Sequence, residues 1–399
     1  MKKAFLLLAA LGLIASMTAS AQKLSDRDIL VKIYQQTNGD NWGDYYKNGW
    51  CSGEDLSKWR NVKVNAEGRV VELSLYKPKG VIPAEIGGLT ELKKLTISME
   101  NRSRNNDPAD CIPAAISALT KLETLSISVS QVDAKCPDLK PLTSLKKLVL
   151  AFSQNTDYPD LSAQTGLESL DLSGFHGAIP DVIYKMKNLE RLCITTGKLE
   201  GGLSPDVANL KALKHLQIDH TAGFVGGVDK PDCALPLKEI CSLPELELVW
   251  FRAIANKGTI PSDVGKLKKA RYLVLIDLGL TGGIPKEIGN MTSVETLEIY
   301  DNPLLGGKIP KEIGKATAIR SLWLQNNGLV GGIPKEIGKL TNLESLYLAK
   351  NKLTGKIPAE LAGCTKLGKG IFTDFTGNQL DPDIPEAVRN LEFFSKIKF

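Results

Sequence analysis

Residues 343–358 read Leu343-Glu344-Ser345-Leu346-Tyr347-Leu348-Ala349-Lys350-Asn351-Lys352-Leu353-Thr354-Gly355-Lys356-Ile357-Pro358. The same pattern returns 24 residues earlier at Ile319, Leu322, Leu324, Asn327, Leu329, Ile333 and Pro334. Further copies begin at Val294, Ala270, Leu246, Leu213, Leu189, Leu167, Leu145, Leu122, Leu92 and Val70, and a last copy is anchored by Asn378, Leu380, Ile384 and Pro385. The chain therefore contains a tandem array of about 13 short units.

Each unit is expected to contribute one short β-strand. Leu346 and Leu348 alternate with polar neighbours, so their side chains point to one side of the strand. Such a strand cannot bury its apolar side alone, whereas stacking on neighbouring copies produces a parallel sheet with a continuous core. An asparagine follows the strand in several copies, and we expect its amide to satisfy buried backbone groups of the next coil. These residues are Asn302, Asn327, Asn351 and Asn378.

The first half of each copy, L-x-x-L-x-L-x-x-N-x-L, is the leucine-rich repeat signature. Its second half, as in Leu329-Val-Gly-Gly-Ile333-Pro334-Lys-Glu-Ile337-Gly, resembles the plant-type repeat with L-x-G-x-I-P. The chain thus resembles a secreted bacterial leucine-rich repeat protein, and also the ectodomains of plant receptor-like proteins. The resemblance implies an α/β solenoid: a right-handed superhelix of about 13 coils, with a concave parallel β-sheet, short 3-10 or helical turns on the convex side and an N-terminal helical cap.

Four segments are predicted along the chain. Residues 1–21 read as a secretory signal peptide, with Lys2 and Lys3 before an apolar run and Ala19-Ser20-Ala21 as the cleavage site. Residues 22–69 lack the repeat and form the N-terminal cap, residues 70–391 form the solenoid, and residues 392–399 close its last coil. We therefore expect export to the periplasm, the cell surface or the medium. No transmembrane segment is expected in the mature chain, because no second apolar run approaches ~20 residues.

The cap segment is expected to contain a helix over 28–36, with Ser25 as its N-cap and Ile29, Leu30 and Ile33 facing inward. Trp42, Trp50 and Trp59 are interpreted as cap core rather than as a ligand site. The segment Asn38-Gly39-Asp40-Asn41-Trp42 resembles the cap of the same family, and the resemblance implies a cysteine pair near Trp50. Cys51 has no evident local partner for such a pair.

Composition excludes several classes of function. The 399 residues carry 50 Lys and Arg against 45 Asp and Glu, and the resulting net charge of +5 is spread along the chain. This distribution favours neither disorder nor nucleic-acid binding. With 3 His and 7 Cys there is little material for metal or acid–base chemistry. The sequence contains no phosphate-binding loop and no nucleophile elbow, so we predict no catalytic residue, no metal site and no cofactor.

The outward positions of the strands change character along the array. In the first copies they are small or mixed, as in Ser74, Thr96 and Ser126. From the eighth copy they include Trp250, Tyr272, Tyr300, Trp323 and Tyr347, which we expect to form one continuous aromatic strip across five neighbouring strands. Contiguous exposed apolar surface marks binding sites, whereas the alternative is that aromatic residues simply favour strands. The predicted partner-binding residues are Trp250, Arg252, Tyr272, Glu298, Tyr300, Trp323, Gln325 and Tyr347.

Other polar residues could suggest chemistry. Cys193 and His215 could form a nucleophile–base pair, and His215, Asp219 and His220 could hold a metal, but we interpret them as a solvated polar patch. The sequence allows disulfides between Cys111 and Cys136 and between Cys233 and Cys241 but decides neither of them. Cys364 replaces a core leucine and is expected to be a buried free thiol. Two copies are longer, with extra residues near 98–108 and 221–232, which could contact a ligand or be tolerated surface loops.

The sequence thus predicts a non-enzymatic secreted protein of the cell envelope that binds a protein or peptide on the concave face of its repeats. A glycan-binding or self-associating adhesin or scaffold is the alternative, and a thiol hydrolase using Cys193 and His215 is a remote one. We expect a monomer.

Overall fold

A computed structural model describes residues 24–99, 111–129, 135–195, 198–220, 235–370 and 373–399. The predicted signal peptide lies outside these residues, as do all of the second predicted insertion and all of the first except residues 98 and 99.

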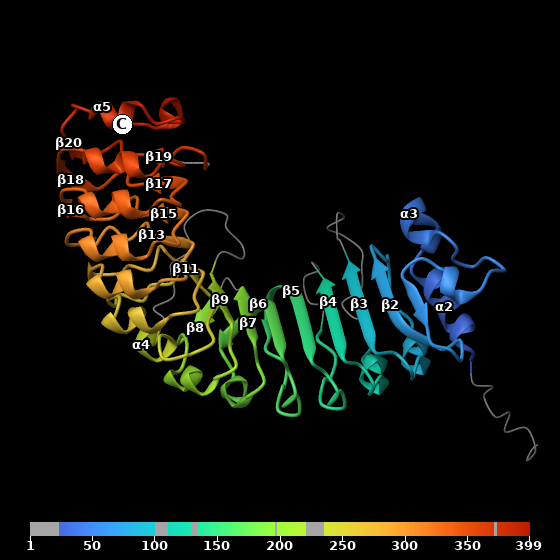
Figure 1. Ribbon diagram of the computed structural model, residues 1–399. Helices are drawn as coiled ribbons and strands as arrows, with labels where there is room; N and C mark the ends of the chain where they lie inside the picture. The colour runs from blue at the N-terminus through green and yellow to red at the C-terminus, as the bar shows by residue number, and fades with distance from the viewer. Residues whose placement is uncertain (1–23, 100–110, 130–134, 196–197, 221–234, 371–372) are drawn as a thin grey trace, which may run out of the picture.

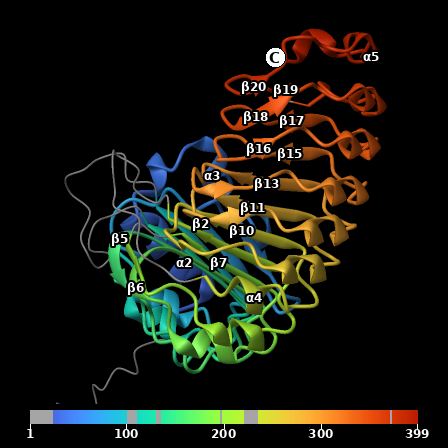
Figure 2. The same ribbon diagram turned by 90° about the vertical axis from the view of Figure 1, so that its left-hand side faces the viewer.

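The described chain is an arc of stacked coils with a long β-sheet on its inner, concave side and short turns on its outer side (Figure 1). The sheet bends most between β9 and β11, so that its two halves face a common hollow. Figure 2 shows the coils from β10 to β19 stacked one above another. The expected parallel sheet with 3-10 turns opposite it is confirmed.

The main sheet has 15 strands that follow one another almost in chain order. Every described pairing in it is parallel except β1 with β2. The strands are β1 (Val62–Val64), β2 (Val70–Tyr76), β3 (Lys94–Met99), β4 (Thr124–Val129), β5 (Lys147–Asp157), β6 (Ser169–Ala178), β7 (Arg191–Thr195), β8 (Lys198–Glu200), β9 (His215–Asp219), β10 (Leu248–Arg252), β11 (Tyr272–Ile276), β13 (Thr296–Tyr300), β15 (Ser321–Trp323), β17 (Ser345–Tyr347) and β19 (Thr373–Asp374).

Two small sheets lie farther along the coils. They contain β12 (Gly282–Gly283) with β14 (Leu305–Gly306), and β16 (Val330–Gly331) with β18 (Lys352–Gly355) and β20 (Gln379–Leu380). The α-helices are α2 (Asp26–Gln36), α3 (Asp44–Lys47), α4 (Leu237–Ile240) and α5 (Glu386–Arg389). None of the helices in the described ranges is both long and apolar enough to cross a membrane.

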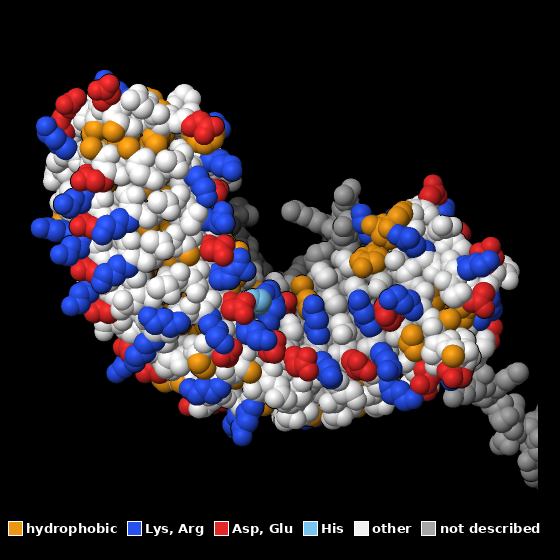
Figure 3. Space-filling view, in the orientation of Figure 1, with side chains coloured by type: hydrophobic (Ala, Val, Ile, Leu, Met, Phe, Trp, Pro, Cys, Tyr) orange, Lys and Arg blue, Asp and Glu red, His pale blue; other side chains and the backbone are white. Residues whose placement is uncertain are grey.

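The outer side carries 3-10 turns whose start is set by proline. In most of them a proline with extended backbone precedes the turn, and the residue three positions later is buried, as with Pro334 and Ile337. The 3-10 elements are η1 (Gly39–Asn41), η2 (Leu56–Lys58), η3 (Ala84–Gly88), η4 (Ala114–Ala118), η5 (Asp181–Lys185), η6 (Pro205–Asn209), η7 (Ser262–Lys266), η8 (Lys286–Asn290), η9 (Lys311–Lys315), η10 (Lys335–Lys339), η11 (Ala359–Gly363) and η12 (Phe394–Lys396). Pro-Lys-Glu triplets recur at the start of these turns, and their lysines Lys286, Lys311 and Lys335 are exposed. Figure 3 shows lysine and arginine side chains along the outer side.

The core lies between the sheet and these turns. Parallel register brings equivalent leucines side by side, as in Leu297, Leu322 and Leu346, which are fully buried. Each apolar strand face is therefore covered by the coils before and after it, as stacking requires.

The asparagines after the strands bond the preceding coil rather than the next one. Asn351 donates from Nδ2 to Leu324 O at 2.8 Å and to Leu348 O at 2.9 Å, and its Oδ1 accepts from Leu329 N at 3.2 Å. Asn302, Asn327 and Asn378 repeat this arrangement with their own neighbours. The predicted role in satisfying buried backbone groups is confirmed, but its direction was wrong.

The N-terminal segment covers the first coil. Its helix α2 begins at Asp26, two residues before the predicted start, because Ser25 and Asp28 form a reciprocal capping box. Trp42, Trp50 and Trp59 are buried, with the first pair of ring centroids 5.0 Å apart and the second 5.3 Å apart. Their predicted place in a core is confirmed.

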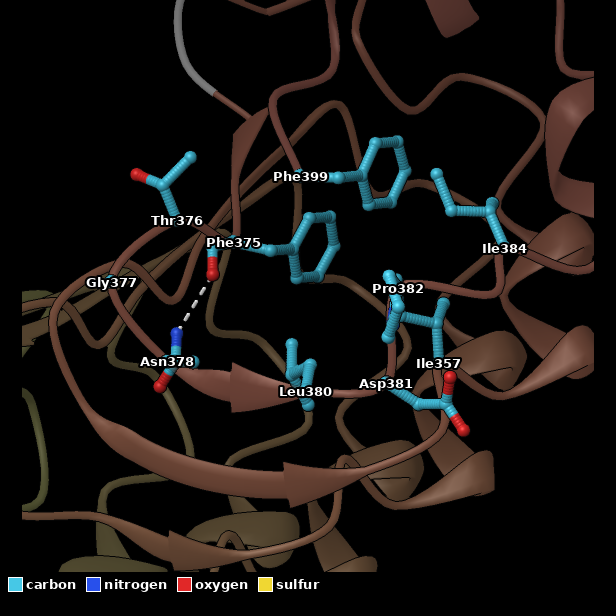
Figure 4. Close-up of a pocket in the computed structure, with 10 residues that line it drawn as sticks. All are labelled: Ile357, Phe375, Thr376, Gly377, Asn378, Leu380, Asp381, Pro382, Ile384 and Phe399. Carbon is cyan, nitrogen blue, oxygen red and sulfur yellow. Dashed lines mark hydrogen bonds between the residues drawn. The ribbon is translucent and has the colours of Figure 1, made fainter.

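The far end of the solenoid is covered by the last residues of the chain. Lys398 pairs with Asp374 beside β19, and Leu391 and Ile397 are buried. The stacked rings of Phe375 and Phe399 line a pocket of about 260 Å³ together with aliphatic side chains (Figure 4). Because this pocket lies where the terminal segment meets the last coil, we interpret it as imperfect packing of the closure.

Cysteines form no disulfide among the described residues. Cys136 is a free thiol, so the bridge to Cys111 that the sequence left open is not formed. Cys51 is also free, so the cysteine pair implied by the family resemblance is not present there. Cys364 is a buried free thiol as predicted, and its Sγ donates to Ile337 O at 3.2 Å. Cys241 is also a buried free thiol, so the bridge to Cys233 that the sequence left open is not formed; Cys233 itself lies outside the described residues.

Candidate functional site

The outward side chains of β10, β11, β13, β15 and β17 form three rows on the concave face. The first row contains Leu248, Tyr272, Thr296, Ser321 and Ser345. The middle row contains Trp250, Val274, Glu298, Trp323 and Tyr347. The last row begins with Arg252, Ile276 and Tyr300, and Gln325 follows because its carbonyl accepts from Asp301 N at 3.3 Å. Parallel register thus makes each row continuous across neighbouring strands.

Three of the rings form a connected group, which we call the aromatic trio: Tyr300, Trp323 and Tyr347. The centroids of Tyr300 and Trp323 are 6.0 Å apart with the rings at 47°, and those of Trp323 and Tyr347 are 6.0 Å apart at 81°. Tilted and edge-to-face contacts of this kind are favourable for aromatic pairs. All three side chains are half-buried, so each also presents surface to the hollow.

The expected continuous strip of five rings was wrong. Tyr272 lies in the first row, while Trp250 lies in the middle row and is separated from Trp323 by Val274 and Glu298. The physical reason is that each strand has three outward positions, so rings on neighbouring strands meet only when they occupy the same or adjoining rows.

The two apolar residues that interrupt the strip are themselves buried. Val274 is 1% exposed between Trp250 and Glu298, and Ile276 is 4% exposed between Arg252 and Tyr300. Sequence reasoning treated both as outward surface, because the alternation of a strand does not tell how far larger neighbours cover a small residue.

Charge on this face is sparse. Burial raises the pKa of Glu298, and burial together with the Glu298 carboxylate raises the pKa of Tyr300, an effect that Arg252 opposes. Within the described residues no hydrogen bond or ion pair is found for the Glu298 carboxylate. A partly desolvated carboxylate without a partner is typical of a functional surface rather than of a stabilising ion pair.

Polar atoms on the same face also lack partners in the described chain. The Gln325 side chain is 8% exposed, and its Oε1 is buried without a hydrogen-bond donor. Trp250 Nε1 is likewise buried without an acceptor. Buried polar groups are normally satisfied, so these atoms are candidates for contacts with a ligand.

The rim of the face is built by a recurring backbone turn. One residue shortly after each of these five strands has a positive φ of 52° to 57°. It directly follows the strand at Ala253 (56°), Asp277 (56°) and Asp301 (57°), and it is the third residue after the strand at Asn326 (52°) and Lys350 (57°). A left-handed residue here turns the chain inward. In three of the coils the next residue is Asn302, Asn327 or Asn351, which belong to the stacked asparagines that we call the asparagine ladder. The ladder therefore holds the strand ends, and with them the rows, in register.

The alternative site at Cys193 and His215 has no catalytic geometry. Cys193 faces Gln217 across the β7–β9 pair, whereas His215 faces Arg191. Burial, the largest cause, raises the pKa of the Cys193 thiol, and this disfavours the nucleophilic thiolate. Asp219 and His220 are buried, not solvated as predicted, since the His220 N–H donates to Arg252 O of the next coil. No group of three or more His, Cys, Asp or Glu residues in the described part could hold a metal ion.

Comparisons with known proteins agree with this architecture. The Leucine Rich Repeat family model matches residues 318–340 and 342–364. A search of curated protein sequences found no match. The fold is a leucine-rich repeat solenoid.

Solved structures from plants and bacteria share this fold. A TDR receptor is 25% identical over 80% of this chain and 58% of its own, with a TM-score of 0.62. The plant peptide hormone receptor RGFR1, in complex with RGF2, is 22% identical over 84% of this chain and 66% of its own, with a TM-score of 0.50. An internalin from Listeria monocytogenes is 20% identical over 84% of this chain and 88% of its own, with a TM-score of 0.58. The chain spans about three fifths of the length of the two receptor structures.

Proposed function

We propose that this chain is a non-enzymatic, exported binding protein that recognises a protein or peptide partner on the C-terminal half of its concave face. The observation that carries the proposal is the aromatic trio, in which Trp323 contacts both Tyr300 and Tyr347. Tyrosine, tryptophan and arginine dominate the energetics of protein interfaces, and Arg252 is exposed at the edge of the same surface.

The shape of the surface supports an extended ligand. Rows of side chains run across the strands, and β13, β15 and β17, which carry the trio, lie on the inner side of the arc (Figure 1). The space-filling view shows the hollow between the two halves of the arc (Figure 3). A structurally similar receptor is described as a complex with a peptide hormone, which supports the choice of a peptide over other ligands. The export of this chain is proposed from the signal-peptide pattern of residues 1–21.

The test compares a ring inside the trio with an exposed ring outside it. Trp323→Ala is expected to weaken binding of the partner captured from envelope and medium by about 2 kcal/mol, roughly 30-fold in Kd. Tyr45→Ala is the matched control, because Tyr45 is 63% exposed on the N-terminal segment and far along the chain from the trio. Titration calorimetry with the purified partner gives the two constants.

Unchanged affinity of Trp323→Ala, with a control that behaves the same, would remove the trio as the binding site. Aromatic platforms also stack on sugar rings, so binding of Trp323-dependent glycans on a carbohydrate array would favour the glycan-binding alternative. Concentration-dependent sedimentation of the mature chain, lost in the same variant, would favour a self-associating scaffold.

A further inference from the structure

The middle row places carboxylates on both sides of two rings. Register pairs Glu298 with Trp323, Trp323 with Tyr347, and Tyr347 with Asp374. Neighbouring strands are about 4.8 Å apart, so Glu298 and Asp374 flank the two rings within about 15 Å. Asp374 already accepts from the backbone and side chain of Thr376, whereas Glu298 has no such bonds in the described chain.

Other carboxylates in the same coils form ion pairs with arginines. At the opposite edge of the sheet, where the strands begin, Glu295 accepts from Arg271 Nε at 2.8 Å, and Glu344 accepts from Arg320 Nη1 at 3.2 Å. These two carboxylates are therefore neutralised by ion pairs. Glu298 is more buried and has no ion pair within the described residues, and its burial raises its pKa.

Gln325 adds a second hydrogen-bond acceptor to the same place. Its side chain lies beside Tyr300, in the row adjoining Glu298 and Trp323, and its Oε1 is buried without a donor. The site therefore presents a carboxylate, an amide oxygen and aromatic faces. Arg252 lies on the same face and affects the pKa of Tyr300, but within the described residues it forms no ion pair with Glu298. The described part of the chain therefore supplies no cationic donor to these two acceptors.

We propose that the trio, Glu298 and Gln325 bind an arginine side chain of the partner peptide. This inference rests on the proposed function and names the chemistry of its ligand. A guanidinium is flat, always charged and carries five N–H donors, so it can stack on Trp323 while donating to Glu298 and Gln325. A lysine ammonium has no flat face to stack and fits this arrangement less well.

The experiment uses pools of N-acetylated, C-amidated peptides of about nine residues, long enough to cross the five strands. The central residue is arginine, lysine, citrulline or leucine, and the others are randomised. Citrulline has the shape of arginine without its charge. Each pool is passed over the immobilised mature chain at low ionic strength, because salt screens exposed charges, and the retained fraction is measured.

The arginine pool is expected to be retained about tenfold better than the citrulline pool, a difference typical of one charge-assisted contact. Glu298→Gln should bring that ratio close to one. The matched control is Glu344→Gln, which removes a carboxylate that precedes β17 and pairs with Arg320, and it should leave the ratio unchanged. Near-ultraviolet circular dichroism and the thermal midpoint check that both variants are folded.

Three results would overturn the inference. Equal retention of arginine and citrulline pools, with both lost in Trp323→Ala, would leave the proposed function standing and remove arginine recognition. If Glu298→Gln still prefers the arginine pool, residues other than Glu298 bind the guanidinium charge. Retention of no pool, or retention indifferent to Trp323→Ala, would count against both the inference and the peptide-binding function.

Discussion

The asparagine ladder yields a prediction whose size follows from its hydrogen bonds. In Asn351→Ala, Leu329 N–H loses its side-chain acceptor and is left buried without a partner. The carbonyls of Leu324 and Leu348 lose one donor each but keep a second, from Asn327 and Asn378. An orphaned buried donor costs about 1–3 kcal/mol and each shared bond about 0.5 kcal/mol, so we expect a loss of about 3 kcal/mol in the free energy of unfolding.

The control is another asparagine of the same coil. Asn342 donates to Thr317 O at an exposed site and accepts from Lys366 Nζ at a partly buried one, so Asn342→Ala should cost only about 0.5 kcal/mol. Urea unfolding followed by circular dichroism measures both variants. Because each coil contacts only its neighbours, hydrogen exchange should show lost protection concentrated around β15 and β17. Equal destabilisation by the two substitutions would refute the assignment of the ladder as a structural support.

Two further predictions concern packing and thiol reactivity. Gly289→Ala should destabilise the chain by about 2 kcal/mol, because a methyl group there would overlap the Glu312 carbonyl oxygen of the next coil, whereas Gly166→Ala, with room for a methyl, should be nearly neutral in the same unfolding assay. Iodoacetamide at pH 7 should modify exposed Cys51 but not Cys364, since burial raises the pKa of the Cys364 thiol to about 12 and keeps it protonated until the pH approaches that value; mass spectrometry showing equal labelling in the folded chain would contradict this.

The fold was largely predictable because it depends on local periodicity. Leu346 and Leu348 repeat their spacing in copy after copy, and only stacking can bury them, so the parallel sheet follows from the pattern. The buried thiol of Cys364 was predictable for the same reason, since it occupies a leucine position. The start of α2 was missed by two residues, because the reciprocal bonds of Ser25 and Asp28 extend the helix.

The sequence predicted which residues belong to the candidate site but not how they are arranged. Sequence reasoning selected Trp250, Tyr272 and the trio as outward residues, but it treated three different outward positions as one strip. The position of each ring within its strand was the signal that separates them, since Tyr272 opens its strand and Tyr300 ends its own. Asp374 was missed because its copy departs from the pattern near Gly368 and Gly370.

The stacking of short units into a solenoid and the gathering of aromatic residues in its later coils follow from the spacing of residues along the chain. The folded arrangement decides which rings touch, that Val274 and Ile276 are covered, and that Glu298 has no ion pair within the described residues. These features depend on register between strands more than 20 residues apart in sequence and on the volume of side chains from neighbouring coils. Distances between such residues are fixed by packing, and no local pattern encodes them.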